Sequence, residues 1–237
     1  MIPKPTPVPD PCRSDPASLR EAEAWVFDLD NTLYPATFNL FGQIDTRMRS
    51  YISRFLGVGL EEAYRLQKHY FREYGTSLHG LMHRHGMDPL PFLEFVHDID
   101  VTVLPPSPGL EAALARLPGR KLVFTNASVR HAERVMGRLG IDHHFEAVFD
   151  IIEADYRPKP QPEGYGVLVR RHGLDAGRTV MVEDIARNLA PAAALGMTTA
   201  WIRTDTEHGT DGADGDYIDH VVDDLVAWLQ EVVAPPP

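Results

Sequence analysis

The short, largely apolar run at residues 23–28 ends in Asp28, and a second carboxylate, Asp30, follows two positions later. Such a run predicts a buried strand, and in an extended chain residues i and i+2 point the same way. Both carboxylates can therefore enter one crevice, and the crevice beyond the carboxyl ends of the strands is where open α/β sheets bind ligands. A simple turn containing Thr32 would explain the same residues, so the pair needs support from elsewhere in the sequence.

Further residues able to contact an anion or a metal ion stand where other predicted elements begin or end. They are Thr125 and Asn126 after an apolar run, Lys159 before a helical pattern, and Glu183 and Asp184 after another apolar run, with Asn188 beyond. Taken singly, each has a structural explanation: a surface charge for Lys159, a strand-end cap for Thr125, and helix-capping acids for the adjacent pair. Their joint occurrence at such positions favours one common site.

Apolar runs and helical patterns alternate along most of the chain. Strands are predicted at residues 23–28, 121–125, 179–183 and 198–202, and helices at 128–139, 163–172, 186–195 and 221–232. Gly140, Gly173 and Gly196 end three of these helices, as glycine commonly does. Strands that alternate with helices of this length predict βαβ units and a mostly parallel sheet covered on both faces. We therefore expect an α/β protein with a doubly wound, Rossmann-like core.

The segment from residue 36 to 104 interrupts this alternation. It contains four helical patterns in succession, at residues 38–56, 60–74, 77–85 and 90–97. Residues 105–109 follow, and their consecutive prolines favour an extended connection. We expect residues 36–104 to form an inserted α-helical cap, residues 21–35 and 105–233 to form the α/β core, and the proline-rich residues 1–20 to be a tail.

The composition argues against several classes of protein. Of 237 residues, 23 are Lys or Arg and 34 are Asp or Glu, which gives a net charge of −11. Nonspecific nucleic-acid affinity needs clustered basic residues, so we expect no nucleic-acid partner. The single cysteine, Cys12, excludes an intramolecular disulfide and favours the cytoplasm. The sequence contains no signal-peptide pattern and no apolar run long enough to predict a membrane span.

The motif DLDNTLYP at residues 28–35 resembles the first motif of the haloacid dehalogenase-like (HAD) hydrolase superfamily, in which D-x-D-x-T follows the first strand. Thr125 resembles the Ser or Thr of the second motif, and Lys159, in RPKP, resembles the lysine of the third. Glu183 and Asp184 resemble the acidic pair of the fourth. All four motifs occur in order between residues 28 and 188.

The resemblance implies a phosphatase mechanism and assigns roles to residues. Asp28 would be the nucleophile that forms an aspartyl-phosphate. Asp30 would protonate the leaving oxygen and then deprotonate the attacking water. Thr125 and the amide of Asn126 would hold the phosphoryl oxygens, together with Lys159.

A carboxylate that attacks a phosphate dianion is repelled by it. At about 4 Å and an effective dielectric constant near 20, each pair of like unit charges costs about 4 kcal/mol, so the site must supply positive charge. The resemblance implies that Lys159 and a Mg²⁺ ion supply it, the ion being held by Asp28, Asp184 and the backbone carbonyl of Asp30, with Glu183 behind them or acting through water. As an acid, Asp30 needs a pKa above its usual value of about 3.9, which a crevice closed by a cap could produce.

A helical insert between the first two motifs is typical of superfamily members that act on small phosphorylated metabolites. Tyr34 and Pro35 resemble the pyrimidine 5′-nucleotidase branch, which implies a pyrimidine nucleoside 5′-monophosphate as the substrate. Asp30 favours phosphate-ester hydrolysis over carbon–halogen cleavage, because the dehalogenase branch lacks this residue. The pair Glu183–Asp184 departs from the Asp-Asp pattern, which leaves the substrate class open.

Other functions fit the same motifs: a sugar-phosphate or phosphoglycolate-type phosphatase, a phosphomutase, or a catalytically silent binding module. Within the cap, Asn39, Phe41 and Gln43 follow the first motif and could reach a base or sugar. His79 and His83 have the i, i+4 spacing of a metal-binding pair, although no third ligand lies nearby in the sequence. We expect a monomer or a homodimer.

Overall fold

The computed structural model describes residues 16–206 and 208–235, and its centre is a six-stranded sheet. The strands lie in the order β3-β2-β1-β4-β5-β6, and all neighbours are parallel. Their bounds are Ala24–Phe27 (β1), Arg120–Phe124 (β2), Ala147–Phe149 (β3), Thr179–Glu183 (β4), Thr198–Ile202 (β5) and His220–Val222 (β6). Because the chain extends the sheet first on one side of β1 and then on the other, the strand order reverses between β1 and β4. Residues that follow these two strands therefore border the ligand-binding crevice.

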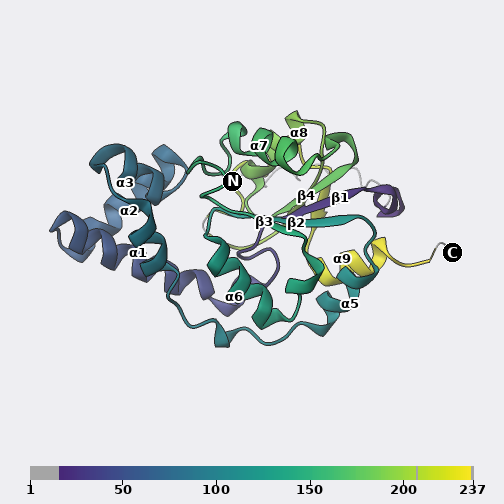
Figure 1. Cartoon of the computed structure of the whole chain (residues 1–237), viewed down its shortest axis with the longest axis horizontal. Coiled ribbons are helices and arrows are strands. Elements are labelled where there is room, and N and C mark those ends of the chain that lie inside the picture. Colours follow the sequence, from purple (N-terminus) through teal and green to yellow (C-terminus); the bar gives the residue numbers. More distant parts are fainter. Residues whose placement is uncertain (1–15, 207, 236–237) are drawn as a thin grey trace, which may run out of the picture.

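Helices cover both faces of this sheet (Figure 1). One face carries Pro108–Arg116 (α5), Val129–Leu139 (α6) and Leu225–Val232 (α9), and the other carries Pro162–His172 (α7) and Ala190–Ala194 (α8). Alternate residues of β1 show the result: Trp25 and Phe27 pack into one hydrophobic cluster, and Ala24 and Val26 into the other. The predicted doubly wound, Rossmann-like α/β fold is confirmed.

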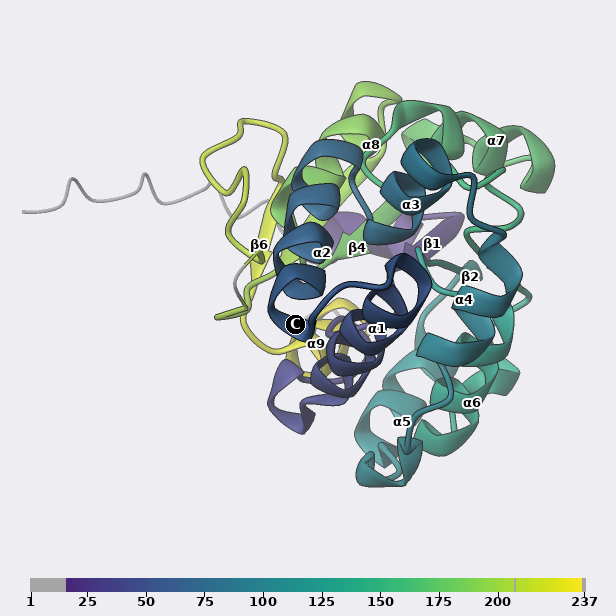
Figure 2. The same cartoon turned by 90° about the vertical axis from the view of Figure 1, so that its left-hand side faces the viewer.

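Four α-helices between β1 and β2 lie to one side of the sheet, in front of β1 and β4 in Figure 2. They are Leu40–Leu56 (α1), Leu60–Tyr74 (α2), Ser77–His85 (α3) and Pro89–Val96 (α4), close to the predicted helices. Thr76 and Asp88 cap α3 and α4, since each side chain accepts a hydrogen bond from a backbone N–H of the first turn. Gly57 ends α1 with a φ of 66°, a left-handed conformation that glycine adopts without a steric cost.

The helix predicted at residues 221–232 is wrong at its start. His220–Val222 is instead the edge strand β6, which pairs with Ala200–Ile202 of β5. Helix α9 begins only after Asp224, whose side chain accepts a hydrogen bond from the N–H of Ala227 at 3.0 Å. Asp224, as the N-cap, therefore sets the start of α9, which the apolar periodicity alone would place several residues earlier.

Three other elements differ from the predictions. Residues 186–195 form a 3₁₀ turn followed by the short α8, and Pro191 lies in the first turn of α8, where its missing N–H is tolerated. Helix α5 begins at Pro108, inside the predicted extended connection, because a proline is equally tolerated in the first turn of that helix. The three-residue strand β3 was not predicted. The 3₁₀ segments are Pro16–Glu21, Ala36–Phe38, Val101–Val103, Asp142–His144, Ala176–Arg178 and Ala186–Leu189.

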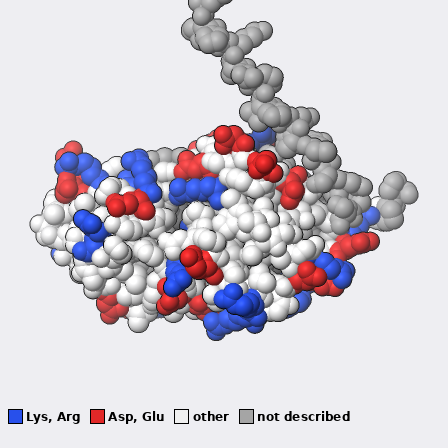
Figure 3. All heavy atoms as spheres, turned by 90° about the horizontal axis from the view of Figure 1, so that it is seen from above, with Lys and Arg blue, Asp and Glu red and all other residues white. Residues whose placement is uncertain are grey.

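The described part of the chain starts inside the segment predicted to be a tail. Pro16–Glu21 forms a 3₁₀ helix, in which Leu19 is 4% exposed and Arg20 Nε donates to the carbonyl of Val232 at 2.8 Å. Cys12 and the rest of residues 1–15 lie outside the described residues. No helix in the described part is both long and apolar enough to cross a membrane. Acidic and basic side chains are intermingled on the face shown in Figure 3.

Candidate active site

A buried lysine links two carboxylates at the carboxyl ends of β1 and β4. Lys159 Nζ donates to Asp28 Oδ1 at 2.6 Å, to Glu183 Oε2 at 2.6 Å and to the carbonyl of Phe124 at 2.9 Å. The backbone N–H of Asp28 continues the sheet by donating to Val182 at 2.8 Å. Asp28, Lys159 and Glu183 are only 6%, 2% and 1% exposed, so these charges interact with little screening by water.

The loop before α7 brings Lys159 to this position, and Asn126 holds the loop. Asn126 Oδ1 accepts the N–H of Lys159 at 2.9 Å, and its Nδ2 donates to the Lys159 carbonyl at 3.4 Å. Its side chain is thus committed to the loop, which leaves its backbone amide for the predicted contact with a phosphoryl oxygen. Thr125, 1% exposed, accepts the N–H of Ala127 at 3.0 Å, so its hydroxyl proton remains available as a donor.

Three carboxylates surround this single ammonium group. Oxygens of Asp28, Glu183 and Asp184 all lie within 4.8 Å of one another. Burial and then the charge of Glu183 raise the pKa of Asp28 to about 7, against the opposing effect of Lys159. Burial, followed by the charges of Glu183 and Asp28, raises the pKa of Asp184 well above its usual value. The pKa of Lys159 is also raised, because Asp28 and Glu183 outweigh its burial.

The site holds more buried carboxylates than ammonium groups, and carboxylate oxygens are the ligands that hard divalent cations such as Mg²⁺ prefer. Glu183 fits a role behind the ligands, because Oε2 binds Lys159 while Oε1 accepts from Asn188 Nδ2 at 3.1 Å and from the N–H of Ile185 at 3.2 Å. Of the residues predicted to hold the metal ion, Asp28, Glu183 and Asp184 therefore lie together, and their charge and chemistry fit a divalent cation.

Asp30 lies beside this cluster, and it is contacted by two side chains to which the sequence analysis gave no role in the site, Tyr34 and His131. Tyr34 OH donates to Asp30 Oδ1 at 2.6 Å, and His131 Nε2 lies 2.9 Å from the same oxygen. Asn31, with a φ of 65°, turns the chain directly after Asp30 in a left-handed conformation that asparagine tolerates. Tyr34 lies only four positions after Asp30 in the sequence, but nothing local to His131 indicates that its ring reaches a residue 101 positions away.

The expectation that Asp30 has a raised pKa is wrong for this structure. Burial alone would raise the pKa, but the charge of His131 and the hydrogen bonds from His131 and Tyr34 lower it by more. Two donors on one carboxylate oxygen stabilise the ionised form. Asp30 is therefore held as a carboxylate, the form that can take a proton from water.

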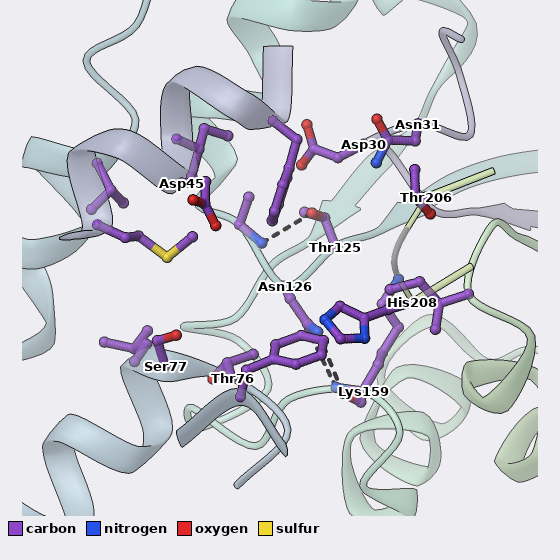
Figure 4. A pocket seen from close by; sticks show the side chains of 18 of the residues that line it. Asp30, Asn31, Asp45, Thr76, Ser77, Thr125, Asn126, Lys159, Thr206 and His208 are labelled. Carbon is purple, nitrogen blue, oxygen red and sulfur yellow. Dashed lines mark hydrogen bonds between the residues drawn. The ribbon is translucent and has the colours of Figure 1, made fainter. Parts of the chain in front are cut away.

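A cavity of about 450 Å³ opens between these residues and helices α1–α4. Figure 4 shows Asp30, Thr125, Asn126 and Lys159 around it, with Asp45, Thr76 and Ser77 contributed by the helical segment. The polar cluster occupies one part of the wall, and the rest is largely apolar.

The predicted contacts of the helical segment divide into two groups. Asn39 and Phe41 line the cavity, whereas Gln43 is hydrogen-bonded to the backbone N–H and C=O of Asp100. His79 Nδ1 is bonded to the carbonyl of Tyr156 at 2.9 Å. Neither His79 nor His83 belongs to a group of potential metal ligands in the described part of the chain.

The part of the chain that carries the site is similar in sequence to an enzyme family. The sequence profile of the haloacid dehalogenase-like hydrolases matches residues 22–196, which include every member of the polar cluster. The chain belongs to this family. The prediction of a HAD-like hydrolase, and hence of an enzyme, is confirmed.

Two relatives are similar in sequence over most of the chain. Phosphate metabolism protein 8 of Saccharomyces cerevisiae is 29% identical over 211 residues, which are 81% of this chain and 63% of the yeast protein, so the chain spans less than two thirds of that relative. Glyceraldehyde 3-phosphate phosphatase of Methanothermobacter thermautotrophicus is 24% identical over 232 residues, which cover 89% of this chain and 99% of that protein.

Solved HAD structures show the same fold. A HAD phosphatase from Thermococcus onnurineus aligns with a TM-score of 0.62 at 19% identity, covering 89% of this chain and 97% of that one. L-2-haloacid dehalogenase from Xanthobacter autotrophicus aligns with a TM-score of 0.56 at 17% identity, covering 89% and 98%. At these identities the likeness establishes the fold alone.

Proposed function

We propose that this HAD hydrolase is a magnesium-dependent phosphatase that hydrolyses a small phosphate monoester through an aspartyl-phosphate on Asp28. The observation that carries the proposal is the buried contact of Lys159 with Asp28 and Glu183, next to Asp184 and within reach of a cavity. One sequence relative has a name that describes a phosphatase, which supports ester hydrolysis over carbon–halogen cleavage. The presence of Asp30 supports the same choice.

In the first step, a carboxylate oxygen of Asp28 attacks phosphorus, and the bond from phosphorus to the ester oxygen breaks. Lys159 offsets the repulsion between the incoming dianion and Asp28, and Thr125 donates to a phosphoryl oxygen. The leaving oxygen takes a proton from Asp30. Because a bound dianion adds negative charge near Asp30, substrate binding favours the protonated form that this step needs.

In the second step, water attacks the phosphorus of the aspartyl-phosphate and gives its proton to Asp30. Inorganic phosphate leaves, and the Asp28 carboxylate is regenerated. The two donors on Asp30 Oδ1 favour the carboxylate that accepts this proton.

Asp28, Asp184 and the backbone carbonyl of Asp30 would hold Mg²⁺, with Glu183 behind them. When bound, the ion supplies positive charge that offsets the charge of the phosphate and of the surrounding carboxylates. Without it, the raised pKa values of Asp28 and Asp184 indicate that protons partly take its place.

Magnesium affinity is therefore expected to increase with pH. Below the Asp28 pKa of about 7, Mg²⁺ must displace the proton of Asp28, so its affinity rises up to about tenfold per pH unit. This contribution of Asp28 levels off at about pH 8. Titration calorimetry in two buffers of different ionisation enthalpy measures both the affinity and the protons released. An affinity that is independent of pH, with no proton release, would contradict this account of the cluster.

The substrate that we propose is a nucleoside 5′-monophosphate, selected by residues 36–104 acting as a cap. The cavity volume of about 450 Å³ lies in the range of small-molecule sites. On the cap side, Gln67 is 2% exposed, its Nε2 donates to Asp45 Oδ1 at 2.9 Å, and its Oε1 has no hydrogen-bond partner among the described residues. A buried acceptor of this kind favours a ligand that brings an N–H or O–H, and Phe41 adds an apolar ring to the lining of the same cavity.

A panel of monophosphates tests the proposal. Release of inorganic phosphate is measured with UMP, CMP, glucose 6-phosphate and phosphoglycolate, with Mg²⁺ and with EDTA. We expect magnesium-dependent release that is fastest with the nucleotides, and slowest with phosphoglycolate, which has no donor for Gln67. Preference for a sugar phosphate would favour the alternative suggested by the archaeal relative's name. Isomer formation without release would indicate a phosphomutase, and no turnover at all a silent binding module.

The cytoplasmic location and the monomeric or homodimeric state remain predictions from the sequence.

A further inference from the structure

We propose that His131 and Tyr34 are positioning residues that hold Asp30 by its Oδ1, so that Oδ2 is the oxygen that exchanges a proton with the substrate. The inference rests on the proposed phosphatase mechanism and goes beyond it by assigning a role to two residues that have none in that mechanism. Tyr34 OH and His131 Nε2 lie 2.6 Å and 2.9 Å from Oδ1. A carboxylate oxygen has about two lone-pair positions, so these two donors occupy Oδ1.

The donor assignment follows from the chemistry of the three groups. An ionised Asp30 can only accept, so the hydroxyl proton of Tyr34 points toward it, and His131 carries a proton on Nε2. Burial and the charge of Asp30 raise the pKa of Tyr34 well above its usual value, which keeps the hydroxyl protonated as a donor. Nδ1 of His131 has no hydrogen-bond partner among the described residues, so the contact with Asp30 is the ring's single polar bond there.

The His131 ring is fixed in place by its surroundings. It is completely buried, and it lies in the first turn of α6, after the strand end that carries Thr125. One face of the ring stacks on His97, with ring centroids 4.6 Å apart and an angle of 21° between the planes. His97 is itself bonded through Nδ1 to Ser128 Oγ at 3.0 Å, and Ser128 caps α6. A ring packed in this way can fix the direction of the carboxylate that it contacts.

The same arrangement connects Asp30 to the end of the helical segment. His97 ends α4, and Arg134 on α6 donates to the carbonyls of His97 and Ile99 at 2.8 Å and 2.7 Å. The chain leaving α1–α4 is therefore bound to the helix that positions the acid. Asp30 is thus held by Tyr34 and His131, and His131 in turn stacks on His97 at the end of α4.

Positioning matters most where the leaving oxygen needs a proton. An alkoxide is a poor leaving group, so its departure depends on a well-placed acid, and proton transfer by such a group contributes about 10²–10⁴-fold. p-Nitrophenolate is a stable anion and leaves without that proton. The ratio kcat/KM reports the steps up to departure of the leaving group, so it isolates this effect from the later hydrolysis of the aspartyl-phosphate.

The test compares two esters with four proteins: the wild type, His131→Leu, His131→Gln and Tyr34→Phe. Glutamine can place a donor near the position of Nε2, whereas leucine cannot. For the alkyl phosphate that the panel shows to be hydrolysed fastest, we expect kcat/KM of His131→Leu to fall about 100-fold and that of Tyr34→Phe about tenfold. For p-nitrophenyl phosphate both should stay within about threefold of the wild type, and His131→Gln should recover most of the loss.

Thermal unfolding of each variant shows whether it is folded at the assay temperature, and Tyr34→Phe and His131→Gln carry the test where His131→Leu does not fold. Equal losses on both esters, or no loss on either, overturn the inference, and so does a failure of glutamine to recover activity. A wild type that hydrolyses neither ester overturns the proposed function, and the inference with it. The two failures are therefore distinguishable in one experiment.

Discussion

Replacing Asp28 by asparagine is expected to reduce phosphate release by at least about 10⁴-fold, because an amide oxygen cannot serve as the nucleophile at this position. Steady-state assays with the best substrate of the panel measure the loss. Asp223→Asn is the matched control: this exposed aspartate pairs with Arg203 at the surface, and its loss should leave kcat unchanged. Substantial turnover in Asp28→Asn would show that another group attacks phosphorus.

The same substitution should stabilise the metal-free protein. The folded-state pKa of Asp28 is raised from 3.8 to about 7. The folded protein therefore loses stability progressively as the pH rises through this interval and Asp28 ionises. Asparagine removes that cost, and we expect a gain of about 1–3 kcal/mol at about pH 8 that shrinks toward about pH 5. Urea denaturation in EDTA at both values measures it. A loss of stability at the higher pH would contradict the account.

Replacing Lys159 by methionine should have the opposite effect on stability. The lysine side chain is 1% exposed and is the ammonium partner of both Asp28 and Glu183. Removing one partner of a buried ion pair leaves uncompensated charge, which typically costs about 3–5 kcal/mol. Phosphate release should fall about 10³-fold, because the positive charge that offsets the substrate's dianion is lost. Denaturation curves and steady-state rates check the two effects.

Two further variants separate charge from packing. Lys121→Met, at a half-buried lysine on β2 that donates to the Gly119 carbonyl, should change stability by less than about 0.5 kcal/mol. The double variant Lys159→Met/Asp28→Asn should regain much of the lost stability, because the remaining charge is closer to balance. If Asp28→Asn raises stability by no more in the Lys159→Met background than in the wild type, the lysine acts through packing rather than through charge.

The position of the proposed nucleophile was accessible from the sequence because it depends on local patterns. The apolar run before Asp28 predicted a strand, and the polar residues after other runs predicted that their side chains meet at one edge of a parallel sheet. The structure has this arrangement, with Lys159 Nζ within 2.6 Å of both Asp28 and Glu183. The beginning of α9 was harder, because the edge strand β6 is defined by its neighbour rather than by its own three residues.

By itself, the sequence determined the alternation of strands and helices, the helical segment between β1 and β2, and the residues that end the central strands. Periodicity, caps and turn residues act over a few positions, so they can be recognised in the chain alone. Only the tertiary structure decided that His131, 101 positions from Asp30, donates to the same oxygen as Tyr34, and that the pKa of Asp30 is lowered rather than raised. Burial and hydrogen bonding oppose each other at this carboxylate, and which prevails depends on groups that only the folded chain brings within 3 Å.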